Sequence, residues 1–310
     1  MEIFASIFVG SILFFCILTI AAIAALFSER VGIVNIAVDG GMIFAAAFYG
    51  IFAQIFSSES IWVQLPLYLV AIIAGIIFSL LQNLLVIKLK ADQIIAGIAM
   101  NLLAFGIAII FLLVLGTSSR FSLVTPELAL AQNAIAGNWG NILSLKLILT
   151  IVIIGCAWFG LSKTKWGLRL KSIGENPQAA AVVGINVNSY KYQGTIISGA
   201  LSGLAGAIYI DYVGSNFAAN VQGLGFLGLA ILIIGQWKVW SIVLAGFGFS
   251  LLYSLGIVLG TGVGALKPLE NYSHFFFIIP YLFTIIVLAL TSKHSLGPKA
   301  VGKNYDKQAR

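Results

Sequence analysis

Charged side chains are scarce in this sequence, and their scarcity decides its class. Only 9% of the residues are charged and 60% are hydrophobic, whereas about a quarter of the residues in a soluble domain are charged. A net charge of +7 would suggest a nucleic-acid partner for a soluble protein. Here the basic residues lie in short segments between long apolar runs, so the sequence indicates an integral membrane protein with no nucleic-acid partner.

Cysteine and histidine are also rare, with two residues of each. Cys16 and Cys156 both fall within apolar runs, and the two histidines are not paired, so neither a disulfide framework nor a metal site is expected. The sequence also lacks the G-x-x-x-x-G-K-S/T pattern that binds nucleotide phosphates. We therefore expect no enzyme activity and no bound cofactor in this chain, and any ATP that drives it must be bound by another polypeptide.

Long apolar runs are what the sequence has in abundance. A helix needs about 20 apolar residues to cross a bilayer, and about nine runs, with eight to ten as the range, come close to this length. The sequence predicts an all-α, polytopic helix bundle that forms a single membrane domain over residues 1–310. The predicted spans cover residues 3–27, 33–55, 63–87, 93–116, 145–162, 193–213, 222–237, 239–259 and 275–292.

Basic residues predict the orientation of the bundle, because cytoplasmic loops carry an excess of Lys and Arg. With the N-terminus outside, fourteen of the seventeen basic residues fall on the inner side. Only Arg120, Lys146 and Lys267 fall on the outer side. We therefore expect the N-terminus outside and the C-terminus in the cytoplasm, where residues 293–310 would form a basic tail.

Residues 28–41 interrupt the apolar pattern with the sequence SERVGIVNIAVDGG. Glycines and charges at this density are typical of a broken or re-entrant helix, which survives at membrane depth only where protein or water covers its backbone. A carboxylate near the bilayer centre costs about 2.5–3.5 kcal/mol on insertion, which singles out Asp39. Asn35 lies one helical turn before it. The pair could line a substrate path or close a gate, or Asp39 could cap a half-helix or pair with Arg30.

A polar loop over residues 163–192 separates two of the apolar runs. Within it, Asn176 can cap a short helix through its side chain, Pro177 suits the first helical position, and Gly184 provides a stop. A short helix on a cytoplasmic loop is suited to insertion into a groove of a partner protein. A solvated loop with one turn of helix is the other interpretation.

Small and polar residues recur within the apolar runs. Thr195, Gly199, Gly203 and Ala207 repeat every four residues, a pattern that lets helices pack closely in lipid. Isolated amides are interpreted first as groups that form hydrogen bonds between helices. The amides in question are Asn101, Asn220 and Gln222.

Four ordered segments resemble one known family. The segments are SERVGIVNIAVDGG, GLRLKSIGENPQAAAVVGINV, GFLGLAILIIGQW, and PYLFTIIVLAL followed by GPKAVGKNY. Together they resemble the permease subunits of bacterial ATP-binding cassette importers for nucleosides, within a wider group that also serves ribose-type sugars and branched-chain amino acids. The resemblance extends over about residues 20–305.

The resemblance implies a multi-pass subunit of the bacterial plasma membrane that pairs with a second, homologous permease. It also implies a cytoplasmic P-loop ATPase, which uses ATP and Mg, and an extracellular substrate-binding lipoprotein. Relatives usually carry Glu where this chain has Asp39, which leaves the geometry of the pathway open. The short helix of the polar loop would be the coupling helix that docks on the ATPase, with the residues Gly174, Glu175, Asn176, Pro177, Gln178, Ala179, Ala180 and Gly184.

Nucleosides are the expected cargo, with ribose-type sugars and branched-chain amino acids as alternatives. An alternative of another class is a self-sufficient secondary transporter in which Asp39 or Asp211 carries protons, but this leaves the polar loop without a role. Nucleosides need stacking surfaces and hydrogen-bond partners, so the candidate pathway residues combine aromatic and polar side chains. They are Asn35, Asp39, Phe44, Phe48, Asn101 and Phe105.

Overall fold

The computed structural model describes residues 2–56, 60–115, 144–261, 273–276, 278–291 and 297–305. Within these ranges the chain forms helices and no β-strand, which confirms the expected all-α class. Seven of the helices are long and apolar enough to cross a membrane. They are α1 (Glu2–Glu29), α2 (Val38–Phe56), α3 (Gln64–Asn83), α4 (Gln93–Leu115), α5 (Leu145–Lys163), α8 (Val187–Val213) and α10 (Val239–Thr261).

The remaining helices are short, and two of them replace predicted spans. Residues 222–237 contain α9, which has only 11 residues, and residues 275–292 contain α12, which has 13. The count of nine full spans is therefore not confirmed. The short elements are α6 (Lys165–Glu175), α7 (Pro177–Val182), α9 (Leu224–Ile234), α11 (Ser273–Phe276), α12 (Ile279–Thr291) and the single turns η1 (Ile61–Val63), η2 (Leu84–Lys88) and η4 (Gly214–Asn216).

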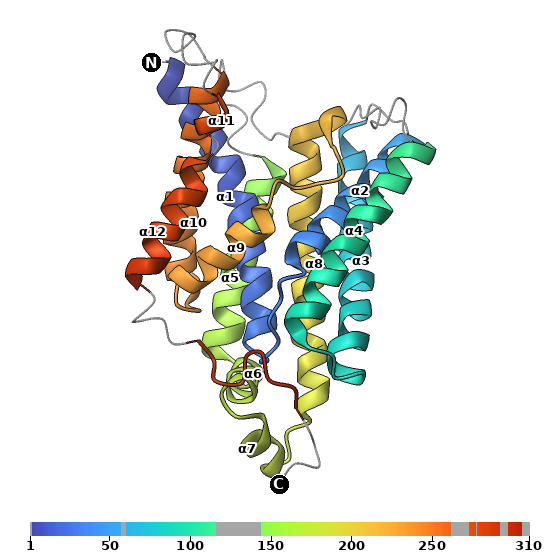
Figure 1. Ribbon diagram of the computed structural model, residues 1–310, viewed down its shortest axis with the longest axis vertical. Helices are drawn as coiled ribbons and strands as arrows, with labels where there is room; N and C mark the ends of the chain where they lie inside the picture. The colour runs from blue at the N-terminus through green and yellow to red at the C-terminus, as the bar shows by residue number, and fades with distance from the viewer. Residues whose placement is uncertain are drawn as a thin grey trace.

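Two groups of helices share the same order of elements and run in opposite directions (Figure 1). In the first group, the long helix α1 is followed by non-helical residues 30–37 and then by α2, α3 and α4. In the second, α8 is followed by residues 214–223 and then by α9, α10 and α12. The long helices exchange partners: α1 packs on α9 and α10, α8 packs on α2 and α3, and α1 and α8 pack on each other. This is the inverted repeat of many membrane transporters.

The contact between α3 and α8 depends on glycine. A Cβ atom on Gly75 would overlap the carbonyl oxygen of Gly199, and a Cβ atom on Gly203 would overlap that of Ala71. Helix backbones approach this closely in lipid only where side chains are absent or small. The predicted role of the small residues every four positions in α8, close helix packing, is confirmed.

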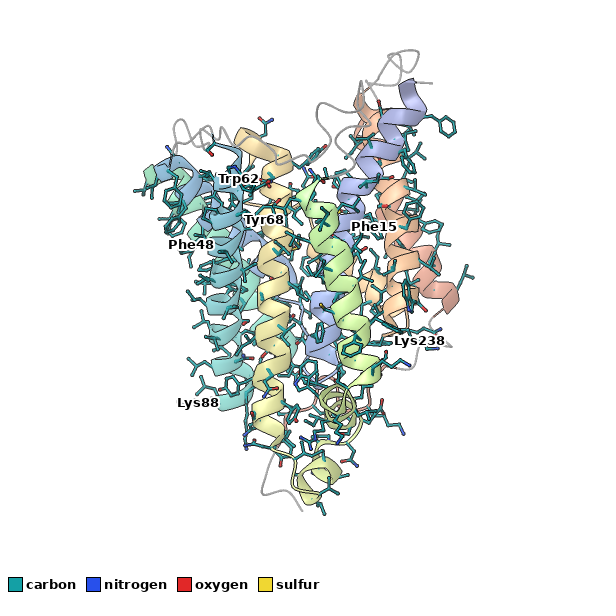
Figure 2. The ribbon with its side chains drawn as sticks, turned by 180° about the vertical axis from the view of Figure 1, so that it is seen from behind. Phe15, Phe48, Trp62, Tyr68, Lys88 and Lys238 are labelled. Carbon is teal, nitrogen blue, oxygen red and sulfur yellow. The ribbon has the colours of Figure 1, made fainter. Side chains whose placement is uncertain are left out.

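The two ends of the bundle differ in charge. Lys88 and Lys238 lie at one end (Figure 2), where α6 and α7 also lie, and the N-terminus lies at the other (Figure 1). We call these the basic end and the opposite end. Arg120 and Lys267, which the sequence places away from the basic end, lie outside the described residues.

Candidate functional site

The segments that follow α1 and α8 bring the first residues of α2 and α9 together deep inside the bundle. We call residues 30–37 the inner break and residues 214–223 the outer break. The carboxylate of Asp39, in the first turn of α2, accepts a hydrogen bond of 2.9 Å from the backbone N–H of Gly225 in α9. A Cβ atom on Gly225 would overlap the backbone of Asp39, so this approach requires glycine.

Asp39 therefore caps a half-helix, which is one of the alternatives that the sequence left open. The capped helix is α9, whereas Asp39 itself belongs to α2. A side-chain acceptor at a helix N-terminus satisfies an N–H that has no partner within the helix. Asp39 is only 7% exposed, so its charge is placed where the N-terminal end of α9 stabilises it. The pairing with Arg30 is not formed; Arg30 contacts a different residue, described below.

Side chains of α4 hold the backbone in and just after the inner break, and α8 binds the side chain of Asn35. Asn101 in α4 accepts a hydrogen bond from the N–H of Gly40 at 2.8 Å and donates one to the carbonyl of Ile36 at 3.1 Å. Gln93 accepts from the N–H of Val34 at 2.8 Å, and Asn35 donates to Ser198 of α8 at 2.8 Å. These bonds replace the helical bonds that the break removes. Their presence gives Asn35 and Asn101 a structural task, and their predicted role in a pathway remains a prediction.

A buried polar cluster fixes the inner break at the basic end. The Arg30 guanidinium donates to the carbonyl of Trp237 at 2.5 Å, and the Trp237 indole N–H donates to the Glu29 carboxylate at 2.6 Å. Burial lowers the pKa of Arg30, and the nearby Glu175 opposes that shift. The cluster ties the end of α1 to the turn after α9, so the two halves of the bundle are joined at this end as well as at Asp39.

The outer break is anchored by tyrosines. Tyr281 in α12 donates to the carbonyl of Gln222 at 2.5 Å, and Tyr253 in α10 donates to the Gln222 side chain at 3.0 Å. Near the opposite end, the Asp211 carboxylate accepts hydrogen bonds from Tyr49, Gln64 and Tyr68. These contacts join α8 to α2 and α3 and give Asp211 three donors.

The three aromatic candidates lie on the α2–α4 side of the molecule. Phe44 and Phe48 of α2 are in ring contact with each other, with centroids 4.7 Å apart, and they also contact Phe78 and Phe111 of α3 and α4. Phe48 lies towards the edge of the bundle (Figure 2). Phe105 is 41% exposed on α4. The structure therefore groups Phe44 with Phe48 and places Phe105 on the exposed face of α4.

The polar loop over residues 163–192 contains more helix than expected. The predicted short helix is present as α7: Asn176 accepts from the N–H of Ala179 at 3.0 Å, Pro177 is the first helical residue, and Gly184 has a φ of +84°. Its tip is apolar and open, with Val182 87% exposed. Helix α6 was not predicted; Thr164 caps it by accepting from the N–H of Gly167.

Two residues of the predicted coupling set face the protein and the others lie at its surface. Gly174 is buried, and a Cβ atom there would meet the carbonyl of Arg30 at 2.5 Å. Ala180 is buried with Ile173 and Val187 in a small apolar cluster beneath α7. The exposed or half-buried members are Glu175, Asn176, Pro177, Gln178, Ala179 and Gly184.

Residues 297–305 pack across the basic end, and we call them the strap (Figure 1). The N–H of Ala300 donates to the carbonyl of Gly174 at 2.9 Å, and the Asn304 amide donates to the carbonyls of Lys90 and Ala91. Tyr305 packs on the apolar cluster beneath α7. The predicted basic tail is thus in part an ordered structural element; residues 293–296 and 306–310 lie outside the described residues.

Comparison with known proteins identifies the family to which the chain belongs. The family described as branched-chain amino acid transport system / permease component matches residues 7–290. The chain belongs to this family. The nucleoside ABC transporter permease protein NupC of Lactococcus lactis is 36% identical over 94% of this chain and 93% of its own length. The guanosine ABC transporter permease protein NupQ of Bacillus subtilis is 33% identical over 94% of each chain.

A second permease protein of Lactococcus lactis, NupB, is also similar, at 24% identity over 76% of this chain and 68% of its own length. No solved structure matches this permease. Two different permeases of one organism therefore resemble it, to clearly different degrees.

Sequence reasoning missed two parts of the permease site. The sequence placed residues 214–221 in a loop between two full spans, whereas the second of these spans, residues 222–237, contains only the 11-residue helix α9. The strap contacts α6, the inner break and the α3–α4 turn, all of which are distant in sequence. One available signal for the outer break was the amide spacing in NFAANVQG, where amides recur at residues 216, 220 and 222.

Proposed function

We propose that this permease is one of two permease subunits of an ATP-driven importer and that its cargo is nucleosides. The observation that carries the proposal is the similarity to NupC and NupQ over 94% of the chain. The lower identity to NupB supports a complex in which this chain takes the place of NupC and a second, NupB-like permease completes the membrane part.

The basic end is proposed to face the cytoplasm of a bacterial cell, with the N-terminus outside. The excess of Lys and Arg at that end supports this orientation. It places α6, α7 and the strap in the cytoplasm and Asp211 near the outer surface, where an extracellular binding lipoprotein would deliver the cargo.

The ATPase is proposed to dock on α7 and on the residues that flank it, Gly174 to Gly184. The exposed Val182 and Val183 supply an apolar tip for a groove, as helix-in-groove recognition requires. ATP and Mg would be bound by the ATPase, because this chain has no phosphate-binding loop.

A mechanical route leads from α7 to the centre of the bundle. Gly174 contacts the Arg30 carbonyl, Arg30 is bound to Trp237, and the inner break leads to Asp39, which caps α9. When ATP binding closes the ATPase, movement of α7 would tilt α1, α2 and α9 together. A path beside these elements would then open to each side in turn.

Docking is tested by replacing Glu175 and Pro177 together with alanine in the full importer complex. We expect loss of the co-purifying ATPase from a permease that is still inserted and folded, because the first turn of α7 is no longer fixed. Lys238→Ala, at the same end but outside the loop, is the matched control. Undiminished recovery of the ATPase with the double variant would contradict the docking site.

Cargo is tested by uptake of labelled uridine in competition with unlabelled guanosine, ribose and leucine. A nucleoside importer is inhibited by guanosine and unaffected by the other two. Inhibition by ribose or leucine alone would replace nucleosides with a sugar or an amino acid.

A further inference from the structure

The outer break alternates between buried and open residues. Phe217, Ala219 and Val221 are at most 1% exposed, while the residues between and beside them are exposed: Asn216, Ala218, Asn220 and Gln222. One side of the segment is therefore fixed in the core, and the other side is an open surface with an amide at three of its four positions. We call this surface the amide track.

The amide track begins within the membrane. The 11 residues of α9 cover at most about 16 Å of membrane depth at 1.5 Å per residue, and α9 lies between Gln222 and the turn at the basic end that holds Lys238. The hydrocarbon core is about 30 Å thick. Gln222, just before α9, therefore lies within the hydrocarbon core, and the outer break leads from there to the end of α8 near the opposite end (Figure 1).

Contact between lipid and the amide track would be energetically unfavourable. Non-helical backbone and amide side chains at membrane depth are tolerated only where protein covers them or where they line a water-filled cavity. Two residues of the segment other than glycine also hold left-handed backbone angles, with φ of 58° at Ala219 and 52° at Gln222. Such strain is uncommon and clusters at functional sites.

We propose that the amide track lines the nucleoside path and that Asn220 and Gln222 bind the passing nucleoside by hydrogen bonds. This inference rests on the proposed function and adds the residues that recognise the cargo. An amide offers a donor and an acceptor side by side, which matches the edge of a nucleobase. Phe226, 45% exposed on the first turn of α9, offers a surface on which a base can stack.

The neighbouring contacts orient the amides. Tyr253 donates to the side-chain oxygen of Gln222 at 3.0 Å, which leaves the amide NH₂ of Gln222 directed away from Tyr253. Among the described residues, Asn220 makes two long local contacts, at 3.4 Å to the carbonyl of Ala218 and 3.3 Å from the N–H of Gln222. Gln222 thus supplies a fixed group and Asn220 an adaptable one.

The test uses two adjacent alanines as a matched pair. Ala218→Cys and Ala219→Cys make the same change in size at an open and a buried position of the outer break. Each is made in a Cys16→Ala, Cys156→Ala background within the full importer in native membranes, and labelled with a charged, membrane-impermeant thiol reagent. We expect rapid labelling at residue 218, little at 219, and slower labelling at 218 when guanosine or uridine is present.

Two results would overturn the inference. Absence of labelling at residue 218 would mean that lipid or the second permease covers the amide track. Labelling that no nucleoside slows would mean that the surface is wet but does not bind the cargo. Nucleoside uptake by the cysteine-free parent is measured in parallel. If the parent transports nucleosides, either of these results contradicts only the role of the amide track. If the parent transports none, the proposed function is contradicted as well.

A second variant gives an independent measurement. Asn220→Ala leaves the buried side of the outer break untouched, and we expect the nucleoside concentration for half-maximal uptake to rise about tenfold, the ratio for one hydrogen bond of about 1.4 kcal/mol. The amount of inserted permease should be unchanged. Uptake identical to the parent at all nucleoside concentrations would contradict a binding role for Asn220.

Discussion

The inner and outer breaks occupy equivalent places in the two inverted groups of helices, but they are built differently. No residue of the inner break is exposed, and side chains of α4 bind its backbone at Val34 and Ile36. The outer break exposes an amide at three of four alternate positions and contains no charged residue. The inner break is thus a closed joint, by which we mean a break whose backbone is buried and bound by neighbouring helices. The outer break, at the equivalent place in the second group, has an open surface.

Asp39, which joins the helix after the inner break to the helix after the outer break, should have the largest effect when it is replaced. Asp39→Leu removes the cap of α9 and leaves the buried N–H of Gly225 without its acceptor, which should lower the free energy of unfolding by about 3 kcal/mol. Asp39→Asn keeps an acceptor oxygen and should cost about 1 kcal/mol or less. The thermal unfolding midpoint of the purified complex measures both. A loss as large for Asn as for Leu would mean that the charge matters more than the cap.

The inner break should be the more sensitive of the two to loss of a single donor. Trp237→Phe removes the indole N–H that binds the buried Glu29 carboxylate, and we expect a cost of about 2 kcal/mol. Trp240→Phe is the matched control, because Trp240 is 59% exposed and should change stability by about 0.5 kcal/mol at most. Equal midpoints for the two variants would mean that the bond from Trp237 to Glu29 does not stabilise the closed inner break.

The strap touches the inner break, since a Cβ atom on Gly32 would lie 3.2 Å from the Ala300 carbonyl. Asn304→Ala breaks two bonds to the α3–α4 turn and should cost about 1 kcal/mol. We expect faster hydrogen exchange in residues 297–305 and weaker stimulation of the ATPase by cargo. Lys303→Ala, an exposed neighbour, is the control. Unchanged exchange in Asn304→Ala would show that these bonds do not hold the strap.

The smallest effect on stability is expected at the open surface. Asn220→Ala should change the free energy of unfolding by about 0.5 kcal/mol or less, although it alters uptake. Asn35→Ala in the inner break removes a buried bond to Ser198 and should cost about 1–2 kcal/mol. The difference between these two asparagines is checked by chemical denaturation in one detergent. A larger cost at Asn220 would show that the outer break is also a closed joint.

Local signals in the sequence were sufficient for α7 and for the inner break. Asn176, Pro177 and Gly184 each fix the backbone by themselves, and the charges around residue 30 interrupt an apolar run. The outer break, the strap and the task of Asp39 depend on partners far away in the chain, such as Gly225 and Gly174. The periodicity of apolar residues indicates which side chains are buried. It does not indicate which distant segments of the chain they contact.

The place of the strap in the chain sets an order of assembly. Residues 297–305 are synthesised after every helix that crosses the bundle, yet they complete the contacts of Gly174, next to α7. A chain whose insertion has stalled would therefore present α7 without the strap that braces it. If the ATPase docks on α7 as proposed, it would meet the complete docking surface only after the whole chain has been made, so an incomplete permease would not engage it fully.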